Sequence, residues 1–348
     1  LPDGDVLDIL PKLNKQKPNL KIIVISAKST LITAVRAEKK GAYHYLPKPF
    51  DIDEVIDLVT KVIYSKKSNN NDIKQHLSNQ LNTNFYDTGP VIGKSVIMQE
   101  TYKLIARLVT SNLSVIITGE TGTGKKLIAR SIHDLSEKNS KPFVTLTMND
   151  FRVNENNSGY ENFSLDLKNK LSNLNGGTLF IDEIGESDFV QQTELLRFLE
   201  NENFLKMTNN QIEYCEPRLI AATRIDIQEL IKNGKFREDL FYKLNVVPIY
   251  LPPLRDRLED IPELLNHFMK IFSNSSQDLK QFSNEGIDYL QNMDWPGNIQ
   301  ELKNFVERLS LITSEDIITI EAIKNILNTH SSSFSSNILV NSLDVYIE

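Results

Sequence analysis

The sequence has 348 residues, a length that allows two or three domains of roughly 100–200 residues each. Hydrophobic residues make up 40% of the chain and charged residues 24%, values typical of folded proteins, so wholesale disorder is excluded. The net charge of −7 argues against a protein whose whole surface binds nucleic acid, because phosphate binding needs an excess of Lys and Arg. A local basic module is not excluded.

Cysteine and histidine usage restricts the chemistry of the chain. Cys215 is the only cysteine, which excludes an intrachain disulfide and a cysteine-based zinc site. The five histidines are scattered without metal-ligand spacing, so we expect no metal site built on histidine. No apolar run reaches the ~18–20 residues of a membrane span, and no signal peptide is recognisable. We therefore expect a cytoplasmic protein with no membrane partner.

Residues 1–64 alternate helices and strands, which implies a parallel α/β sheet. In chain order the pattern predicts a helix over Val6–Leu13, a strand over Lys21–Ile25, a helix over Thr30–Lys40 closed by Gly41, a strand over Tyr43–Leu46, and a helix capped by Asp51 whose apolar face runs from Val55 to Ile63. The Ser-, Lys- and Asn-rich residues 65–88 are predicted to be a linker.

The main body follows as an α/β core, residues 89–255, and a helical subdomain, residues 256–328. Strands are predicted at Ser114–Thr118, Phe143–Thr147, Thr178–Ile181, Leu219–Ala222 and Val246–Tyr250. From Glu259 onward the pattern is entirely helical, at about 259–272, 284–293, 299–312 and 320–327. Residues 329–348 are a Ser-rich tail, and since the chain also opens at Leu1 without an initiator Met, we expect it to be shortened at both ends.

A glycine-rich loop, Gly119-Glu120-Thr121-Gly122-Thr123-Gly124-Lys125, joins the strand at Ser114–Thr118 to a helix at Leu127–His133. Its glycines let successive backbone N–H groups face an anion, and the helix N-terminus adds its dipole. Lys125 would reach the β- and γ-phosphates of a nucleotide. The alternative is an ordinary Gly-rich turn with a surface lysine. The motif ends in Lys126, so no Ser or Thr hydroxyl is offered to Mg²⁺ there.

A second apolar strand ends in two carboxylates, Asp182 and Glu183. Asp182 can hold Mg²⁺ directly or through water, and Glu183 can orient an attacking water; a plain helix cap is the alternative. Thr223, at the end of another buried strand, could contact the γ-phosphate. Arg237, in a charged helix, could act as a finger toward a neighbouring subunit's γ-phosphate, although spacing alone favours a surface salt bridge.

Together these residues resemble the AAA+ ATPase domain of the sigma-54-dependent activators, the NtrC family of response regulators, and within it the NtrX-like branch. The matching strings cover about residues 89–312 in the family's order: Val91–Ser95, Gly119–Lys125, Gly176–Gly185, Arg218–Thr223, Phe236–Val246, Leu251–Arg257, Glu259–Pro262 and Trp295–Leu302. The resemblance implies ATP and Mg²⁺ as cofactors. It also implies the adenine end of the pocket at Ile92 and Gly93, Walker A at Gly119–Lys125 with Lys126 beside it, Walker B at Asp182 and Glu183, sensor I at Thr223 and an arginine finger at Arg237.

Residues 1–64 resemble the C-terminal half of a flavodoxin-like receiver domain. Ser26 matches the phosphate-sensing hydroxyl, Tyr45 the switch aromatic and Lys48 the lysine that contacts the phosphoryl group. A hydroxyl and an ammonium both bind phosphate oxygens, so these residue types suit that role. The phospho-accepting aspartate would lie upstream of Leu1. The resemblance implies a sensor histidine kinase as a partner.

The sequence departs from the family pattern at several positions. The Gly-Ala-Phe-Thr-Gly-Ala loop that grips sigma-54 has no counterpart in Met148–Asn175, where Gly159 is the only glycine. Single replacements are Lys126 for the usual Glu, Lys243 for the second finger arginine, Gln300 for the sensor II arginine, and Thr147 for the Asn that restrains the Walker B glutamate. Fis-type DNA-binding helices are expected after the lid, where this chain has its Ser-rich tail.

Three functions remain open at this stage. The first is a two-component response regulator that controls transcription through an ATP-binding AAA+ domain; the second is a non-hydrolysing nucleotide-binding scaffold that signals through oligomerisation; the third is a AAA+ enzyme that remodels proteins. The receiver half favours the first two. The missing loop argues against direct sigma-54 remodelling. Further implied partners are a second copy of the chain, in a ring or dimer, DNA through a C-terminal module absent from this chain, and RNA polymerase.

Overall fold

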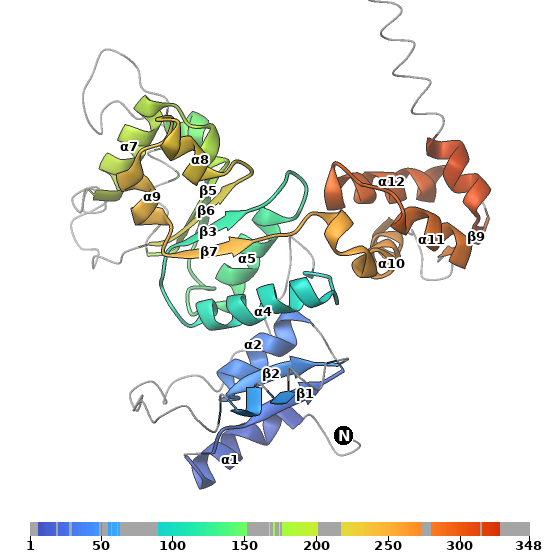
Figure 1. Ribbon diagram of the computed structural model, residues 1–348, viewed down its shortest axis with the longest axis horizontal. Coiled ribbons are helices and arrows are strands. Elements are labelled where there is room, and N and C mark those ends of the chain that lie inside the picture. The colour runs from blue at the N-terminus through green and yellow to red at the C-terminus, as the bar shows by residue number, and fades with distance from the viewer. Residues whose placement is uncertain are drawn as a thin grey trace, which may run out of the picture. The chain divides into compact units, whose positions relative to one another are not determined.

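The computed structural model describes residues 6–18, 20–27, 30–48, 50, 55–56, 58–60, 62, 90–151, 167, 170, 174, 176–200, 217–272, 280–313 and 315–327. The chain divides into two compact units, whose elements are labelled in Figure 1. The sheet unit comprises Leu1–Gly119 and Lys125–Leu251, and the lid unit comprises Glu120–Gly124 and Pro252–Glu348.

The N-terminal segment of the sheet unit contains the alternating elements that the sequence predicts. They are the 3₁₀ turn η1 (Val6–Asp8), α1 (Leu10–Gln16), β1 (Ile23–Ser26), α2 (Leu31–Lys39) and β2 (His44–Pro47). The two strands are parallel, with Ser26 opposite Pro47. The bounds predicted for the first helix are wrong, because the α-helix begins only at Leu10. Pro11 lies in its first turn, where the missing N–H of proline leaves no helical hydrogen bond unmade.

The prediction for the second helix is confirmed. Thr30 caps α2 by accepting a hydrogen bond from the backbone N–H of Thr33, and Gly41 follows the helix at φ +88°. Among the residues predicted to form the third helix, 55–56, 58–60 and 62 are helical, whereas Asp51 lies outside the described residues. The same is true of the predicted linker, residues 65–88, and of the tail, residues 329–348.

The rest of the sheet unit is built around a five-stranded parallel sheet with helices packed against it (Figure 1). Its strands are β3 (Val115–Thr118), β4 (Phe143–Thr147), β5 (Thr178–Asp182), β6 (Arg218–Thr223) and β7 (Val247–Tyr250), in the order β4-β5-β6-β3-β7. All five predicted strands are present, each within one residue of its predicted ends. The helices are α4 (Val96–Val109), α5 (Lys125–Leu135), α7 (Phe189–Glu200), α8 (Ile227–Lys232) and α9 (Glu238–Leu244), with 3₁₀ turns η2 (Met148–Phe151) and η4 (Ile184–Glu186).

Both faces of this sheet are buried, as expected for a parallel sheet. Along β3, Val115 and Ile117 belong to one hydrophobic cluster and Ile116 to the other, because successive strand side chains point to opposite faces. The carboxyl ends of the strands lie at one edge, so Thr118, Asp182 and Thr223 share it. That edge carries the polar residues that the sequence predicts to be functional.

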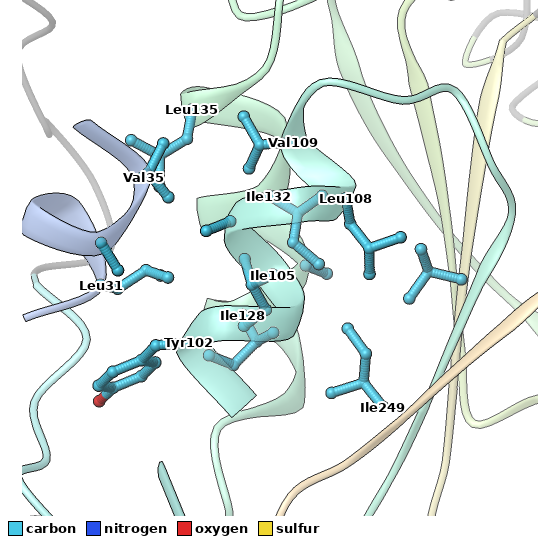
Figure 2. Packing of buried hydrophobic residues seen from close by; sticks show 14 of the residues in the cluster. Leu31, Val35, Tyr102, Ile105, Leu108, Val109, Ile128, Ile132, Leu135 and Ile249 are labelled. Atoms are coloured by element: carbon cyan, nitrogen blue, oxygen red, sulfur yellow. The ribbon is translucent and has the colours of Figure 1, made fainter. Parts of the chain in front are cut away.

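Helix α2 packs directly on α4 in the larger of the two clusters (Figure 2). Leu31 and Val35 of α2 lie in the same buried cluster as Tyr102 and Val109 of α4. Lys39 adds a hydrogen bond from its Nζ to the carbonyl of Leu135, at 2.6 Å. The N-terminal segment therefore buries its apolar helix face within the sheet unit.

The lid unit is mainly helical. Its elements are η6 (Leu254–Asp256), η7 (Leu258–Asp260), α10 (Ile261–Phe272), β8 (Gln281–Phe282), α11 (Asn284–Gln291), α12 (Asn298–Ile312) and β9 (Ile317–Ile318), and residues 320–327 are also helical. The prediction of an entirely helical segment is wrong at β8 and β9, which pair in parallel through Phe282 and Ile318. Each of these strands has only two residues, which is too short for the sequence to show a strand periodicity. Among the described helices, none is long and apolar enough to cross a membrane.

Candidate nucleotide site

The glycine loop leaves β3 and enters α5 as predicted. Gly119 donates its backbone N–H to the carbonyl of Thr223 at 3.2 Å, which ties the start of the loop to β6. Lys125, the first residue of α5, is 7% exposed and donates from Nζ to the carbonyl of Gly119 at 2.9 Å. The Oε1 atom of Glu183 lies 3.8 Å from the same Nζ. A buried ammonium at a helix N-terminus is a favourable partner for a phosphate.

Asp182 and Glu183 lie at the carboxyl end of β5. Glu183 has a left-handed backbone, φ 52° and ψ 44°, which costs a non-glycine residue roughly 1–2 kcal/mol. Its Oε2 atom is buried and has no hydrogen-bond partner among the described residues. Burial raises the pKa of Glu183, while the nearby ammonium of Lys125 lowers it. Backbone strain and a buried oxygen without a partner occur together at functional sites, and here they suit a carboxylate that binds water.

Thr223 is the last residue of β6 and lies beside the turn that follows Asp182 and Glu183. A Cβ atom on Gly185 would lie only 2.5 Å from Thr223 Oγ1, so this turn packs directly on the threonine. Thr223 Oγ1 accepts a hydrogen bond from the backbone N–H of Ile225 at 3.0 Å and donates to the carbonyl of Ile225 at 3.1 Å. The hydroxyl must therefore exchange a local partner before it can contact a phosphate.

At two positions in the tip of the loop, Glu120–Gly124, the backbone has a conformation that only glycine adopts easily. Gly122 has φ +79° and Gly124 has φ +100°. At Gly122 a Cβ atom would also meet the carbonyl oxygen of Gly297 at 2.2 Å. Thr123 is buried, and its Oγ1 donates to the carbonyl of Glu120 at 2.8 Å. The glycine spacing of the motif is thus required by the backbone itself.

Three further candidates flank the loop in the sequence. Gly93 is buried just before α4, and its carbonyl accepts a hydrogen bond from Gln99 Nε2 at 3.3 Å. Ile92 is half-buried, which leaves part of its side chain available to a ligand. Lys126 is exposed, in contrast to Lys125 beside it.

The three residues predicted to form the receiver switch lie at the ends of β1 and β2. Lys48 donates its backbone N–H to the carbonyl of Ser26 at 2.8 Å. Tyr45 is buried, which raises its phenol pKa, and a side-chain hydrogen bond to Ser26 acts in the opposite direction. The structure therefore brings Ser26, Tyr45 and Lys48 together.

Comparison with known proteins gives three domain matches. A receiver domain of response regulators matches residues 1–60, a sigma-54 interaction domain residues 91–250, and a AAA+ ATPase lid domain residues 255–337. The DNA-binding transcriptional regulator NtrC of Rhizobium meliloti is 38% identical over 337 residues, which cover 94% of this chain and 68% of that protein. NtrC of Escherichia coli K12 is 36% identical over 330 residues, covering 92% and 69%.

Solved structures agree with these matches. NtrX from Brucella abortus in complex with ATP has a TM-score of 0.56 and 29% identity, covering 92% of this chain and 70% of that one. Its complex with ADP has the same TM-score and 28% identity, covering 91% and 72%. This chain belongs to the NtrC family of response regulators. It combines receiver sequence with a sigma-54-type AAA+ domain and its lid.

In this NtrC-family chain, Arg237 is anchored on three sides. Its Nε and Nη2 atoms donate to the carboxylate of Asp239 at 3.0 and 2.8 Å, so the surface salt bridge that spacing favours is present. Its Nη1 atom donates to Thr193 Oγ1 at 3.2 Å. Its backbone N–H donates to Oε1 of Gln192, a fully buried residue of α7.

Gln192 is a residue that sequence reasoning missed. Its Nε2 atom donates to the carbonyls of Ser187 and Lys235 at 3.0 and 2.9 Å, so one amide joins the start of α7 to the turn before Arg237. The sequence signal that could have identified Gln192 is a polar amide at a helix position where the apolar spacing predicts a core residue.

The residues that differ from the family pattern are either exposed or make hydrogen bonds to residues close by in the sequence. Lys243 and Gln300 are exposed, and Gln300 donates to Asn304 Oδ1 at 2.9 Å. Thr147 donates both its N–H and its hydroxyl to Asp150 Oδ2, at 2.7 and 3.0 Å. Most of Met148–Asn175, including Gly159, lies outside the described residues.

Proposed function

We propose that this response regulator binds ATP with Mg²⁺ through its AAA+ domain and uses the bound state to control transcription. The observation that carries the proposal is the pair formed by Lys125 and Glu183. The buried ammonium of Lys125, at the start of the helix that follows the glycine loop, lies 3.8 Å from Oε1 of Glu183. The other carboxylate oxygen of Glu183, Oε2, is buried and has no hydrogen-bond partner among the described residues. The NtrX structures with ATP and ADP support a nucleotide as the ligand.

Each residue of the site then has a role set by its chemistry. Lys125 binds the β- and γ-phosphates, and the backbone N–H groups of Gly119–Lys125 face the same oxygens. Ile92 and Gly93 contact the adenine. Glu183 orients water toward the γ-phosphate, and Thr223 senses that phosphate.

Asp182 is the residue that would hold Mg²⁺. Proteins bind this ion through one or two carboxylates together with substrate phosphates, and a single carboxylate at a strand end fits that pattern. Lys126 stands where a Ser or Thr hydroxyl would otherwise bind the ion, so Asp182 and the nucleotide phosphates would supply the oxygen ligands of Mg²⁺. When bound, Mg²⁺ neutralises charge on the phosphates.

Replacing Asp182 with asparagine tests this assignment. We expect the affinity for ATP in the presence of Mg²⁺ to fall about 10–100-fold, because a metal ligand is lost. Without Mg²⁺ the affinity should stay the same or rise, since one negative charge near the phosphates is removed. Isothermal titration calorimetry with and without Mg²⁺ measures both values.

The matched control is Asp226→Asn. Asp226 caps α8 in the same unit, and asparagine caps a helix equally well. Equal losses for Asp182→Asn with and without Mg²⁺ would remove the metal role from Asp182. If the unmodified chain binds no ATP in either condition, the proposed function itself is wrong.

We also propose that hydrolysis is weak, because two of the three arginines that stabilise transition-state charge in this fold are replaced. Lys243 offers a point charge without the guanidinium fork, and the exposed Gln300 carries no charge. Arg237 and Glu183 remain. The second candidate, a non-hydrolysing scaffold, is favoured by the engagement of the Thr223 hydroxyl with Ile225.

Sigma-54 is expected not to be remodelled directly by this protein. The segment Met148–Asn175 contains no Gly-Ala-Phe-Thr-Gly-Ala string, and a motor cannot push on a partner without the loop that contacts it. We expect no nucleotide-dependent capture of sigma-54 when the protein is held with ADP and a metal fluoride. A sigma-54 activator that has the loop is the positive control in the same pull-down.

Robust capture of sigma-54 by this chain would restore the usual activator function. Tyr160 or Phe163 would then be the residue to replace, since these two aromatic residues follow Gly159 and flank Glu161 and Asn162.

The remaining partners follow from the family. We propose a sensor histidine kinase upstream, self-association in a ring or dimer, and contact with DNA and with RNA polymerase downstream. The boundaries proposed above, receiver sequence at 1–64, a core at 89–255 and a lid at 256–328, define the segments for testing each partner.

A further inference from the structure

The tip of the phosphate loop belongs to the same compact unit as the lid, and one buried amide joins them. Asn298, the first residue of α12, is fully buried. Its Nδ2 atom donates to the carbonyl of Thr121 at 2.9 Å and to Glu120 Oε2 at 3.2 Å. Its Oδ1 atom accepts the backbone N–H of Leu254 at 2.8 Å. A single side chain thus connects the loop tip to two lid segments.

Two arginines of the lid hold the same loop. Arg257 is 1% exposed, and its Nη2 atom donates to the carbonyl of Thr123 at 3.2 Å. The guanidinium of Arg255 donates to both carboxylate oxygens of Glu120, at 2.9 and 2.5 Å. These bonds, together with that from Asn298, lower the pKa of Glu120 to about 2. The lid therefore binds two backbone carbonyls and one carboxylate of the loop tip.

These contacts bear on the anion-binding shape of the loop. A phosphate loop works when its successive N–H groups converge on one point, which requires the carbonyls between them to face away. The carbonyls of Thr121 and Thr123 are held by donors from the lid. Gly122, between them, contacts the Gly297 carbonyl so closely that no Cβ atom would fit.

We propose that Asn298 is a positioning residue for the phosphate loop: its amide, with the guanidinium of Arg257, holds the loop in its anion-binding shape before the nucleotide arrives. This inference rests on the proposed function, nucleotide binding at this loop. Asn298 touches no phosphate in this scheme and acts through the Thr121 carbonyl.

Asparagine suits the position for two reasons. Its φ of +55° lies in the left-handed region, which asparagine and aspartate tolerate better than other non-glycine residues. It also offers a donor to Thr121 and an acceptor to Leu254 at once. Aspartate would keep the backbone and the acceptor but would lose the donor and place a second charge beside Glu120.

The test is Asn298→Asp, measured as ATP affinity by isothermal titration calorimetry. At about pH 7.5 we expect a loss of roughly 10–100-fold, the range expected when a buried carbonyl loses its donor. At about pH 5 the new carboxyl is partly protonated, and its O–H can donate to Thr121 again. The affinity deficit relative to the unmodified chain should then shrink. In the unmodified chain the pKa of Glu120 is lowered to about 2, first by the Arg255 hydrogen bond and then by that from Asn298, so Glu120 is ionised at both pH values in the reference protein.

Asn284→Asp is the matched control, because it makes the same change at an exposed site in the first turn of α11. It should leave ATP affinity unchanged at both pH values. Asn298→Gly is the second variant: glycine adopts the same backbone, and the Thr121 carbonyl loses its donor without a new charge. We expect it to lose affinity at both pH values, without recovery.

The outcomes separate the two proposals. If the unmodified chain binds ATP and both Asn298 variants bind it equally well, the positioning role is wrong and the proposed function stands. A deficit in Asn298→Asp that does not shrink at low pH and that parallels a loss of thermal stability in the nucleotide-free protein would show a merely structural role. If the unmodified chain binds no ATP, both proposals fail together.

Discussion

Replacing Lys125 with alanine is expected to remove ATP binding, with a loss of affinity of roughly 10²-fold or more, the range for deleting one partner of a buried charged contact. Lys125 is buried at the start of α5, and no other lysine or arginine among the described residues forms an ion pair with Glu183. A triphosphate placed at this loop would lose its main countercharge. Isothermal titration calorimetry with ATP measures the effect.

The control for this variant is Lys232→Ala, which removes an exposed lysine from the last turn of α8 in the same unit. It should bind ATP as the unmodified chain does. The nucleotide-free Lys125→Ala variant needs a thermal melt as well, because losing the ammonium also removes the positive charge that lowers the pKa of the half-buried Glu183 carboxylate. Unchanged ATP affinity in a folded Lys125→Ala protein would contradict the assignment of this loop as the nucleotide site.

The second large effect is an expected increase in the rate of ATP hydrolysis. Restoring both missing guanidinium groups, in the double variant Lys243→Arg/Gln300→Arg, should raise the rate of ATP hydrolysis by up to about 10³-fold, the amount one arginine finger contributes in related phosphoryl transfers. Both positions are exposed, so neither arginine has to be accommodated in the core. Steady-state phosphate release at saturating ATP and Mg²⁺ measures the gain.

Its control, Lys232→Arg/Gln228→Arg, makes the same two changes on the exposed surface of α8 and should leave turnover unchanged. If the unmodified protein already hydrolyses ATP as fast as the double variant, the two replacements are silent and the inferred defect does not exist. If both proteins bind ATP and neither hydrolyses it, the non-hydrolysing scaffold is the better description of this chain.

The features that the sequence alone determined are those with short-range signals. The strand before the glycine loop is a run of β-branched apolar residues, and the loop itself is encoded by its glycine spacing, so β3, the loop and α5 could all be predicted. The same holds for Asp182 and Glu183 at the end of β5, because the carboxyl ends of parallel strands meet at one edge. Two-residue elements such as β8 and β9 carry no such signal, and Pro11 shifted the first helix from its predicted start.

The tertiary structure alone decided how these residues are held. Glu183 has a buried oxygen without a partner, and the Thr223 hydroxyl is bonded to Ile225; neither state is visible in the motif that each belongs to. Gln192 reaches the Arg237 backbone across 45 residues, and Asn298 reaches Glu120 across 178. Hydrogen bonds between residues so far apart depend on how the sheet and the lid fold, and no local periodicity or spacing encodes them. A sequence motif therefore specifies which groups can bind a phosphate, whereas the packing around it determines whether those groups are already in place.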